Sequence, residues 1–361
     1  MNNPRGGGGV EGSILKGLLR ERDSVYKSPS SPGSRHRKSS SRLDWEASFP
    51  QILRRQKYQL LGSHSAVKKC RWLHESLTRN RPCYKEKFYG IESHRCIQMT
   101  PCLTCDFRCL FCWRTHPEDL GLTEGIRIEN NRWDDPEVIV EESIKAQRRI
   151  LSGYKSHVLK GLLEESKNLE ALNPRHAAIS LDGEPTLYPM LDELISEYSR
   201  RGFTTFLVTN GSNPKALNGL GKEPTQLYLS IYAPNEEKFK ALCSPLNREA
   251  WRKVKESLES LKNFKSSTVV RLTLVKGFNM EDPGEYAGLL GGAEPTYVEA
   301  KAYMYVGYSR KRLGYDAMPS HDEVKGFAEI LAGEMGYNLV ASSEESRVVL
   351  LSRLKTPKRL R

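Results

Sequence analysis

The sequence predicts an α/β fold in which strands and helices alternate along most of the chain. From Cys96 onward, short runs rich in Val, Ile, Thr and aromatic residues predict strands. Amphipathic stretches with capping residues separate these runs and predict helices. Six such strand–helix units favour a parallel sheet that curves into a partial barrel. The 361 residues, 38% of them hydrophobic, suffice for one large domain with small additions.

Two segments precede this alternating region. Residues 1–44 are rich in Gly, Ser, Pro and Arg, which predicts a disordered basic extension with at most a short helix around Ile14–Arg20. We expect residues 45–95 to form a helical module. The rest divides into a partial barrel over residues 96–336, a terminal strand or hairpin over 337–352, and a basic tail over 353–361.

Each element of the barrel follows from a local pattern. The expected strands are Arg95–Met99, Ala177–Leu181, Thr204–Thr209, Gln226–Tyr232, Val269–Val275 and Val298–Tyr305. A helix should begin at Pro136 with Asp135 as its N-cap. Further helices are expected at Met190–Arg201, Glu236–Leu242, Glu249–Phe264, Pro283–Leu290 and His321–Gly336, before a last pair of strands at Leu339–Ala341 and Val348–Leu351.

A run of three cysteines, Cys105, Cys109 and Cys112, has the spacing C-x3-C-x2-C and is followed by Trp113. Three thiolates this close can hold three irons of a cubane iron–sulfur cluster and leave the fourth iron open. Zinc is an alternative, although zinc sites usually use C-x2-C pairs and four ligands. The nearest fourth ligand would be Cys102 or His116.

Cys70, Cys83 and Cys96 form a second set, with twelve residues between neighbours. They could be unrelated core thiols. However, seven of the eight cysteines lie between positions 70 and 112, and this clustering favours a second cubane cluster. We expect Cys102 to be structural and Cys243 to be a core thiol.

The net charge of +12 is uneven along the chain. The tails, residues 1–42 and 353–361, carry +6 and +5, whereas residues 51–95 carry eleven Lys/Arg against three Glu. Such a basic stretch attracts polyanions, and its interleaved aromatic residues favour RNA over a plain solvated surface. The candidate RNA contacts are Lys68, Lys69 and Arg71.

Several motifs together resemble the radical-SAM superfamily and, within it, archaeal-type tRNA 4-demethylwyosine synthases. The resemblance spans about residues 52–352. It rests on the two cysteine triads, Cys83-Tyr-Lys85, Phe88-Tyr-Gly90-Ile, Cys112-Trp113-Arg114, Gly183-Glu184-Pro185, Val208-Thr209-Asn210-Gly211 and Lys301-Ala-Tyr303-Met-Tyr305-Val-Gly307-Tyr.

The resemblance implies an enzyme of tRNA processing in wybutosine biosynthesis. Such lyases condense pyruvate with N1-methylguanine beside the anticodon of tRNA-Phe, using S-adenosylmethionine (SAM) and two 4Fe–4S clusters. The eukaryotic members carry a flavodoxin-like domain, and because only about 50 residues precede the core here, we expect an external electron donor. No apolar run is long enough to span a membrane and no secretory signal starts the chain, so we expect a cytoplasmic monomer.

The resemblance also implies roles for individual residues. Cys105, Cys109 and Cys112 would bind the SAM cluster, and the other triad the second cluster. The Gly183-Glu184-Pro185 turn would contact the SAM amino group, and Asn210 the SAM carboxylate or ribose. Lys85 would form a Schiff base with pyruvate. Tyr303, Tyr305 and Tyr308 either line the substrate pocket or form a core stripe.

Two other functions remain open from the sequence alone. One is a different radical-SAM RNA-modifying enzyme. The other is a non-catalytic RNA-binding module stapled by metal, for which the Gly183-Glu184-Pro185 turn would have no use. In a parallel barrel, chemistry sits at the carboxyl ends of the strands, and the second cysteine triad, this turn and Asn210 each follow a predicted strand.

Overall fold

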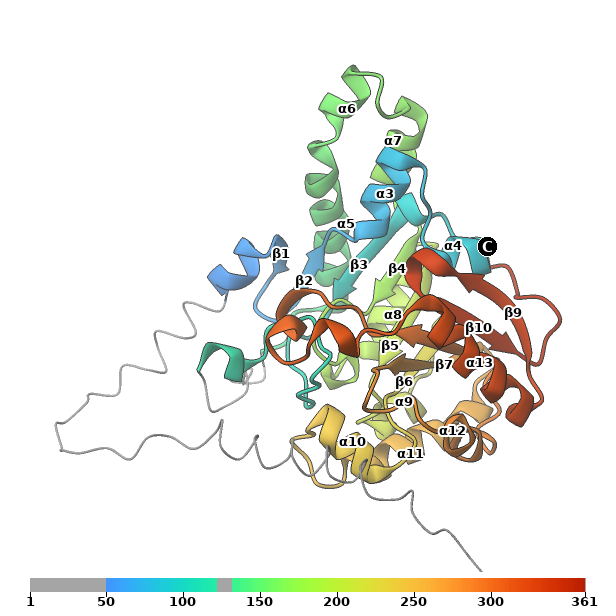
Figure 1. The fold of residues 1–361 in the computed structure, drawn as a ribbon. Coiled ribbons are helices and arrows are strands. Elements are labelled where there is room, and N and C mark those ends of the chain that lie inside the picture. Colours follow the sequence, from blue (N-terminus) through green and yellow to red (C-terminus); the bar gives the residue numbers. More distant parts are fainter. Residues whose placement is uncertain (1–49, 122–131, 361) are drawn as a thin grey trace, which may run out of the picture. The chain divides into compact units, whose positions relative to one another are not determined.

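Ten strands form one mixed sheet in the computed structural model, in the order β1-β2-β3-β4-β5-β6-β7-β8-β10-β9 (Figure 1). The structure describes residues 50–121 and 132–360, so the predicted extension and its short helix lie outside the described residues. The described residues from Pro50 on belong to one compact unit.

The six central strands are parallel, which confirms the predicted partial barrel. Their order in the sheet is their order in the chain, as expected for successive strand–helix units. The strands are β3 (Cys96–Thr100), β4 (His176–Ile179), β5 (Thr204–Thr209), β6 (Gln226–Ile231), β7 (Ser267–Leu274) and β8 (Tyr297–Ala302).

The N-terminal module differs from the prediction, because a hairpin follows the helical residues 50–55 with which its described part begins. The strands β1 (Tyr58–Leu61) and β2 (Ser65–Lys68) pair with each other, and β2 pairs antiparallel with β3. Each strand has only four residues, and its stability comes from docking on the sheet rather than from a local pattern. The predicted helices follow as α3 (Arg71–Arg79), α4 (Tyr84–Tyr89) and the 3-10 turn η1 (Ser93–Arg95).

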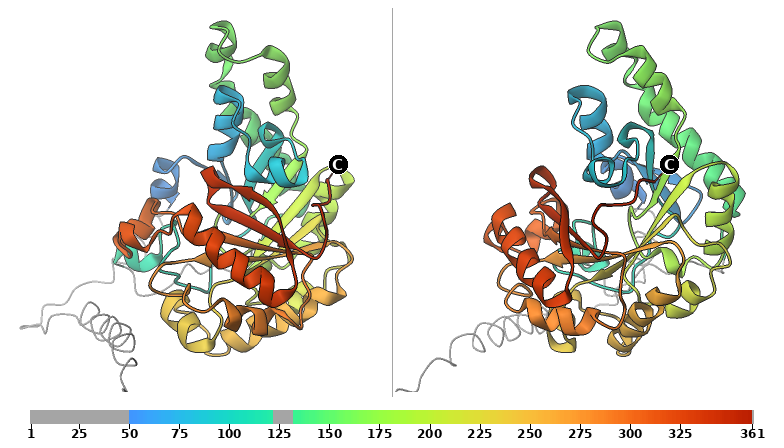
Figure 2. Two further views of the ribbon diagram at one scale, coloured as in Figure 1. Left: turned by 45° about the vertical axis from the view of Figure 1, so that its right-hand side comes forward. Right: turned by 90° about the vertical axis from the view of Figure 1, so that its right-hand side faces the viewer.

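Helices pack around the outside of the sheet (Figure 1 and Figure 2). They are α5 (Pro136–Ser152), α8 (Leu191–Arg200), α9 (Pro214–Asn218), α10 (Glu236–Cys243), α11 (Ala250–Ser260), α12 (Pro283–Leu290) and α13 (His321–Met335). The predicted N-cap is confirmed, since the Asp135 side chain accepts a hydrogen bond from Glu137 N. No helix in the described ranges is both long and apolar enough to cross a membrane.

Two further helices, α6 (Lys155–Leu159) and α7 (Glu165–Leu172), were not predicted. With the end of α5 they form an arm that extends away from the sheet (Figure 1 and Figure 2). The short 3-10 turns are η2 (Pro117–Leu120), η4 (Pro185–Leu187), η5 (Leu261–Asn263), η6 (Gly307–Lys311), η7 (Tyr315–Ala317) and η8 (Glu344–Ser346).

The C-terminal hairpin is confirmed as β9 (Asn338–Ser343) and β10 (Val348–Ser352), and β10 pairs antiparallel with β8. The basic tail then crosses to α4. Lys358 N donates to Tyr297 Oη at 2.8 Å, and Leu360 N donates to Tyr89 O at 2.8 Å. Figure 1 shows the C-terminus beside α4.

Candidate active site

A single cavity of ≈ 680 Å³ gathers nearly all the residues that the sequence singled out. Its lining includes both triads, Lys85, the Gly183-Glu184 turn, Asn210 and the three predicted RNA contacts. Pro185 follows this turn as the first residue of η4. The lining residues just named are Cys70, Cys83, Cys96, Cys105, Cys109, Cys112, Lys85, Gly183, Glu184, Asn210, Lys68, Lys69 and Arg71.

The two triads lie at opposite ends of β3. Cys96 is the first residue of this strand, whereas Cys105 follows its last residue, Thr100. Five residues of strand span roughly 13 Å, which is room for two separate centres. The prediction that chemistry sits at the carboxyl ends therefore holds for Cys105, Cys109 and Cys112, while Cys96 marks the amino end.

Backbone and side-chain contacts fix the loop of the Cys105 triad. Arg108 N donates to Cys243 O at 2.8 Å and Leu110 N donates to Leu242 O at 2.9 Å, so hydrogen bonds hold both sides of Cys109. Arg312 clamps the loop from η6, because its guanidinium donates to Cys112 O and also to Leu110 O at 3.2 Å. Arg312 was not predicted as a site residue.

The other triad combines two helix starts with a strand start. Cys70 is the N-cap of α3, Cys83 is the N-cap of α4, and Cys96 opens β3. Cys83 N donates to Ser93 Oγ at 2.8 Å, which ties the start of α4 to η1. Burial raises the pKa of the Cys70 thiol, and the backbone N–H groups of Trp72 and Leu73 at the start of α3 offset part of this rise.

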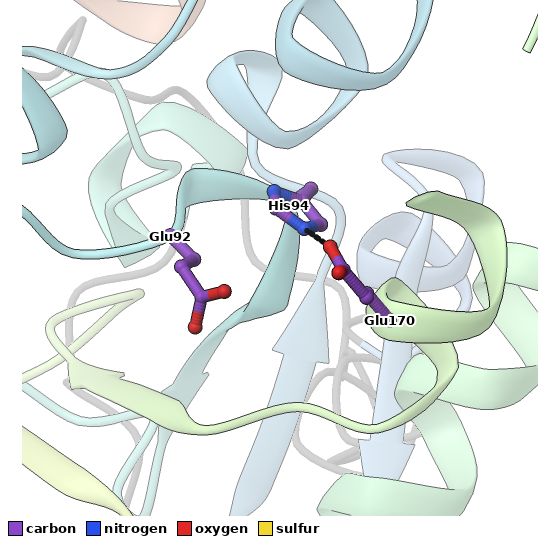
Figure 3. Close-up of side chains that lie close together, drawn as sticks. All are labelled: Glu92, His94 and Glu170. Atoms are coloured by element: carbon purple, nitrogen blue, oxygen red, sulfur yellow. Dashed lines mark hydrogen bonds and ion pairs between the residues drawn. The ribbon is translucent and has the colours of Figure 1, made fainter. Parts of the chain in front are cut away.

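One compact group of metal-ligand side chains lies outside the two cysteine triads. Among the described residues, only Glu92, His94 and Glu170 bring three metal-ligand atoms within 4.8 Å of one another (Figure 3). Neither cysteine triad is that tight, with or without Cys102 or His116.

The group in Figure 3 is explained by ion pairs that hold neighbouring elements together. His94 Nε2 lies 2.7 Å from Glu170 Oε2, which links η1 to α7. Glu92 pairs with Arg95 at 3.3 Å.

The thiol environments also indicate that both triads need a positive partner. Burial raises the pKa of Cys83 and Cys96 to about 12. Burial likewise raises the pKa of Cys105 and Cys109 well above the ordinary thiol value. Bound iron compensates such a cost, because it stabilises thiolate ligands. Cys102 and Cys243 are fully buried outside the lining, as expected for structural and core thiols.

The Gly183-Glu184 turn joins β4 to β5 through the Glu184 carboxylate. Gly183 has φ +63°, and a Cβ there would lie 2.0 Å from Cys102 O, so the turn needs glycine. The carboxylate accepts hydrogen bonds from Thr186 N at 3.0 Å, Thr209 Oγ1 at 2.6 Å and Asn210 N at 2.7 Å. Burial raises the pKa of Glu184 to about 7.

Asn210 lies beside the Cys105 triad. Its Nδ2 donates to Asp106 Oδ1 at 3.0 Å and to Cys105 Sγ at 3.7 Å, and its Oδ1 accepts from Ser212 N at 2.8 Å. Hydrogen bonds to a cluster thiolate tune the reduction potential of the cluster. The amide is therefore placed to act on the sulfur as well as on a ligand.

Lys85, on α4, lines the half of the cavity that holds Cys70, Cys83 and Cys96, away from the Cys105 triad. Its Nζ lies 4.2 Å from the Phe206 ring centroid and 4.1 Å from that of Tyr228. Only 9% of the residue is exposed, and no described carboxylate is within ion-pair distance. Burial, together with the nearby Arg271 guanidinium, lowers the pKa of Lys85 to about 8.

Two more cations line this half and were missed as site residues. Arg271 on β7 donates to Glu299 on β8 at 3.0 Å and to Tyr84 Oη at 2.7 Å. Lys301 Nζ has Ser346 O as its hydrogen-bond acceptor at 2.6 Å, and burial lowers its pKa to about 8. The sequence did contain a signal for these two residues, because each is a charged residue within a strand that is otherwise largely apolar.

The three predicted RNA contacts edge the cavity near aromatic rings. Lys68 Nζ lies over the Tyr58 and Trp113 rings, Lys69 Nζ lies over Tyr154, and the Arg71 guanidinium lies over Trp72. Of the three predicted tyrosines, Tyr303 is buried and lines the cavity. Tyr305 packs edge-on against Tyr315, and Tyr308 lies in η6.

The partial barrel and the cysteine loop after its first parallel strand define the class of protein. Residues 99–290 match the radical SAM superfamily, whose members use SAM and a 4Fe–4S cluster, and residues 292–353 match the wyosine base formation family. This chain belongs to the S-adenosyl-L-methionine-dependent tRNA 4-demethylwyosine synthase family, as its similarity to members of that name shows.

Relatives support this membership along nearly their whole length. The synthases of Pyrococcus abyssi and Methanocaldococcus jannaschii are 51% and 43% identical to this chain, over 84% and 83% of it and 87% and 94% of their own lengths. The solved structure of TYW1 with a lysine–pyruvate adduct bound has a TM-score of 0.77, with 39% identity over 86% of this chain and 98% of its own. Archaeal TYW1 gives a TM-score of 0.70 at 36% identity, over 87% of this chain and 99% of its own.

Proposed function

We propose that this chain makes 4-demethylwyosine in tRNA-Phe by condensing pyruvate with an N1-methylguanine beside the anticodon. The observation that carries the proposal is one cavity lined by two cysteine triads with Lys85 beside one of them. The relatives named for this reaction support it, as does the relative whose structure holds a lysine–pyruvate adduct.

At the carboxyl end of the barrel, Cys105, Cys109 and Cys112 would hold the SAM cluster. When bound, this cluster and SAM supply the radical that removes hydrogen from the guanine N-methyl group. Because protein donors already occupy the Glu184 carboxylate, the backbone carbonyls of the Gly183-Glu184-Pro185 turn would face the SAM amino group. Asn210 would face the SAM carboxylate or ribose, and an external donor would deliver the electron.

At the amino end, Cys70, Cys83 and Cys96 would hold a second 4Fe–4S cluster beside the pyruvate. The Lys85 amine attacks the pyruvate ketone carbon, and loss of water gives an imine. Lys301 lines the same part of the cavity and would face the pyruvate carboxylate, since it has no carboxylate partner among the described residues. Arg271 beside it is already paired with Glu299 at 2.9 Å.

The basic rim would guide the RNA. Lys68, Lys69 and Arg71 would contact backbone phosphates and release counterions, which makes binding salt-dependent. Thiolate ligands need reducing surroundings, so we expect the protein to work in the cytoplasm. We also expect it to act as a monomer.

The proposal is tested by anaerobic incubation with SAM, pyruvate, a reductant and tRNA that contains N1-methylguanosine. Nucleoside mass analysis should show the tricyclic base with pyruvate present and N1-methylguanosine alone without it. Cleavage of SAM with no pyruvate-dependent change in the RNA would instead indicate a different radical-SAM reaction.

A further inference from the structure

A second cavity of ≈ 470 Å³ adjoins the first, since both are lined by Lys68 and Trp113. Its other side chains are Gln56, Tyr308, Arg310 and Lys311. The lining thus combines two aromatic rings, three cations and one amide, and contains no acidic side chain. Lys68 is already a proposed RNA contact and Tyr308 belongs to a quoted motif, but the proposed reaction gives the cavity itself no occupant.

Two of the three cations of this second cavity lie over its rings, and none of the three has a carboxylate partner among the described residues. Lys68 Nζ is 4.9 Å from the Trp113 ring centroid, and Lys311 Nζ is 4.6 Å from that of Tyr308. In the described chain, Lys68, Arg310 and Lys311 form no ion pair. Their charge is therefore available to an anionic ligand.

The spacing of the two aromatic residues is set by the backbone. Tyr308 N donates to Trp113 O at 2.9 Å. Gly307 has φ +62°, and a Cβ there would lie 2.3 Å from Trp113 O, so only glycine allows η6 to approach the cysteine loop this closely. Trp113 directly follows Cys112, which places the second cavity beside the SAM half of the first.

We propose that the second cavity binds the nucleotide adjacent to the target guanine, with its base against Tyr308 and Trp113 and its phosphates near Lys68, Arg310 and Lys311. Aromatic platforms with interleaved cations are the usual means of holding unpaired nucleotides. Continuity with the first cavity makes the neighbouring nucleotide the occupant, because the two cavities share Lys68 and Trp113 and a nucleotide joined to the target guanine lies next to it along the chain. The inference rests on the proposed function, which supplies the RNA.

The test measures binding of the anticodon stem-loop that carries N1-methylguanosine, either intact or with an abasic residue on one or the other side of that base. Tyr308→Leu should weaken binding of the intact RNA by about 5- to 140-fold, the loss expected for one base stack. Against the RNA that is abasic at the stacked position, Tyr308→Leu should change nothing. Tyr308→Phe keeps the ring and should bind like the wild type.

A second measurement concerns the phosphates. Arg310→Gln with Lys311→Gln should reduce the slope of log affinity against log salt by about 0.7 for each lost contact. Equal weakening of intact and both abasic RNAs by Tyr308→Leu, or no weakening at all, would overturn the inference while leaving the proposed reaction in place. A wild type that does not bind this RNA would instead overturn the proposed function as well.

Discussion

Lys85 is buried and has no paired carboxylate among the described residues, and this makes it the residue whose chemistry is most open to test. Its amine lies against Phe206 and Tyr228 rather than in solvent. Lys87, two residues on in the same helix, is exposed and pairs with Glu345 at 3.4 Å. The two lysines therefore provide a matched comparison within α4.

Lys85→Arg should retain iron and SAM cleavage but form no tricyclic base, because a guanidinium keeps the charge and cannot form the imine. Borohydride added with pyruvate should trap a stable adduct at Lys85 in the wild type, located by peptide mass analysis. Lys87→Arg should trap and turn over like the wild type. Product formation by Lys85→Arg at the wild-type rate would exclude the imine.

Lys301→Met should raise the pyruvate concentration needed for half-maximal trapping by about tenfold or more, because a charge-assisted hydrogen bond to the carboxylate is lost. Trapping of hydroxyacetone, a ketone without a carboxylate, should be unaffected. Lys325→Met, an exposed change on α13, serves as the control. Equal losses for both ketones would assign Lys301 to structure, through its bond to Ser346 O.

At the scale of elements, the sequence predicted best what local pattern determines. The helix α12 and the strand β5 have the predicted bounds, since an Asp282 cap starts the first and a run of β-formers makes up the second. The hairpin β1–β2 and the arm α6–α7 were missed. Their stability depends on packing against β3 and α3, and no local signal records such contacts.

The same limit applied to the site. Spacing and resemblance identified the six cysteines, Lys85 and the Gly183 turn, because each lies in a compact motif. Arg271, Glu299 and Arg312 were missed, because strands and turns bring them from more than 150 residues away to Tyr84 and the cysteine loop. Only the folded sheet makes these partners neighbours.

The C-terminal tail acts on α4, the helix that carries Lys85. Leu354 and Leu360 pack on the hydrophobic side chains of Tyr84, Phe88 and Tyr89. Leu360 N also donates a hydrogen bond to Tyr89 O. A segment predicted only as basic is therefore part of the wall behind the Lys85 half of the cavity.

Removal of residues 354–361 should speed amide hydrogen exchange in α4, because the helix loses its outer packing. It should also lower the retention of the second cluster proposed at Cys70, Cys83 and Cys96. Exchange in α8, on the far side of the sheet, should not change. The matched control replaces Lys355, Lys358 and Arg359 by Gln, which removes charge but keeps the backbone hydrogen bonds. If this control behaves like the deletion, the tail acts through charge.

At the scale of the whole molecule, one strand separates two cysteine triads that line one cavity. Cys96 and Cys105 flank β3, so a substrate between them can face SAM on one side and pyruvate on the other. Each triad is held by its own elements: Arg312 and η6 hold one, and α3, α4 and η1 hold the other. This separation predicts that either centre can be lost alone.

Replacing Cys105, Cys109 and Cys112 together by Ala should halve the bound iron and abolish SAM cleavage. Replacing Cys70, Cys83 and Cys96 should also halve the iron, yet leave SAM cleavage that is uncoupled from base formation, because the SAM loop has no side chain from α3 or α4 among its clamps. Iron analysis and deoxyadenosine release measure the two outcomes. Cys102→Ala, a change outside the cavity lining, should keep full iron. Full iron in the Cys70, Cys83 and Cys96 variant would show that this triad holds no cluster, and Lys85 would then have to bind pyruvate without an iron centre beside it.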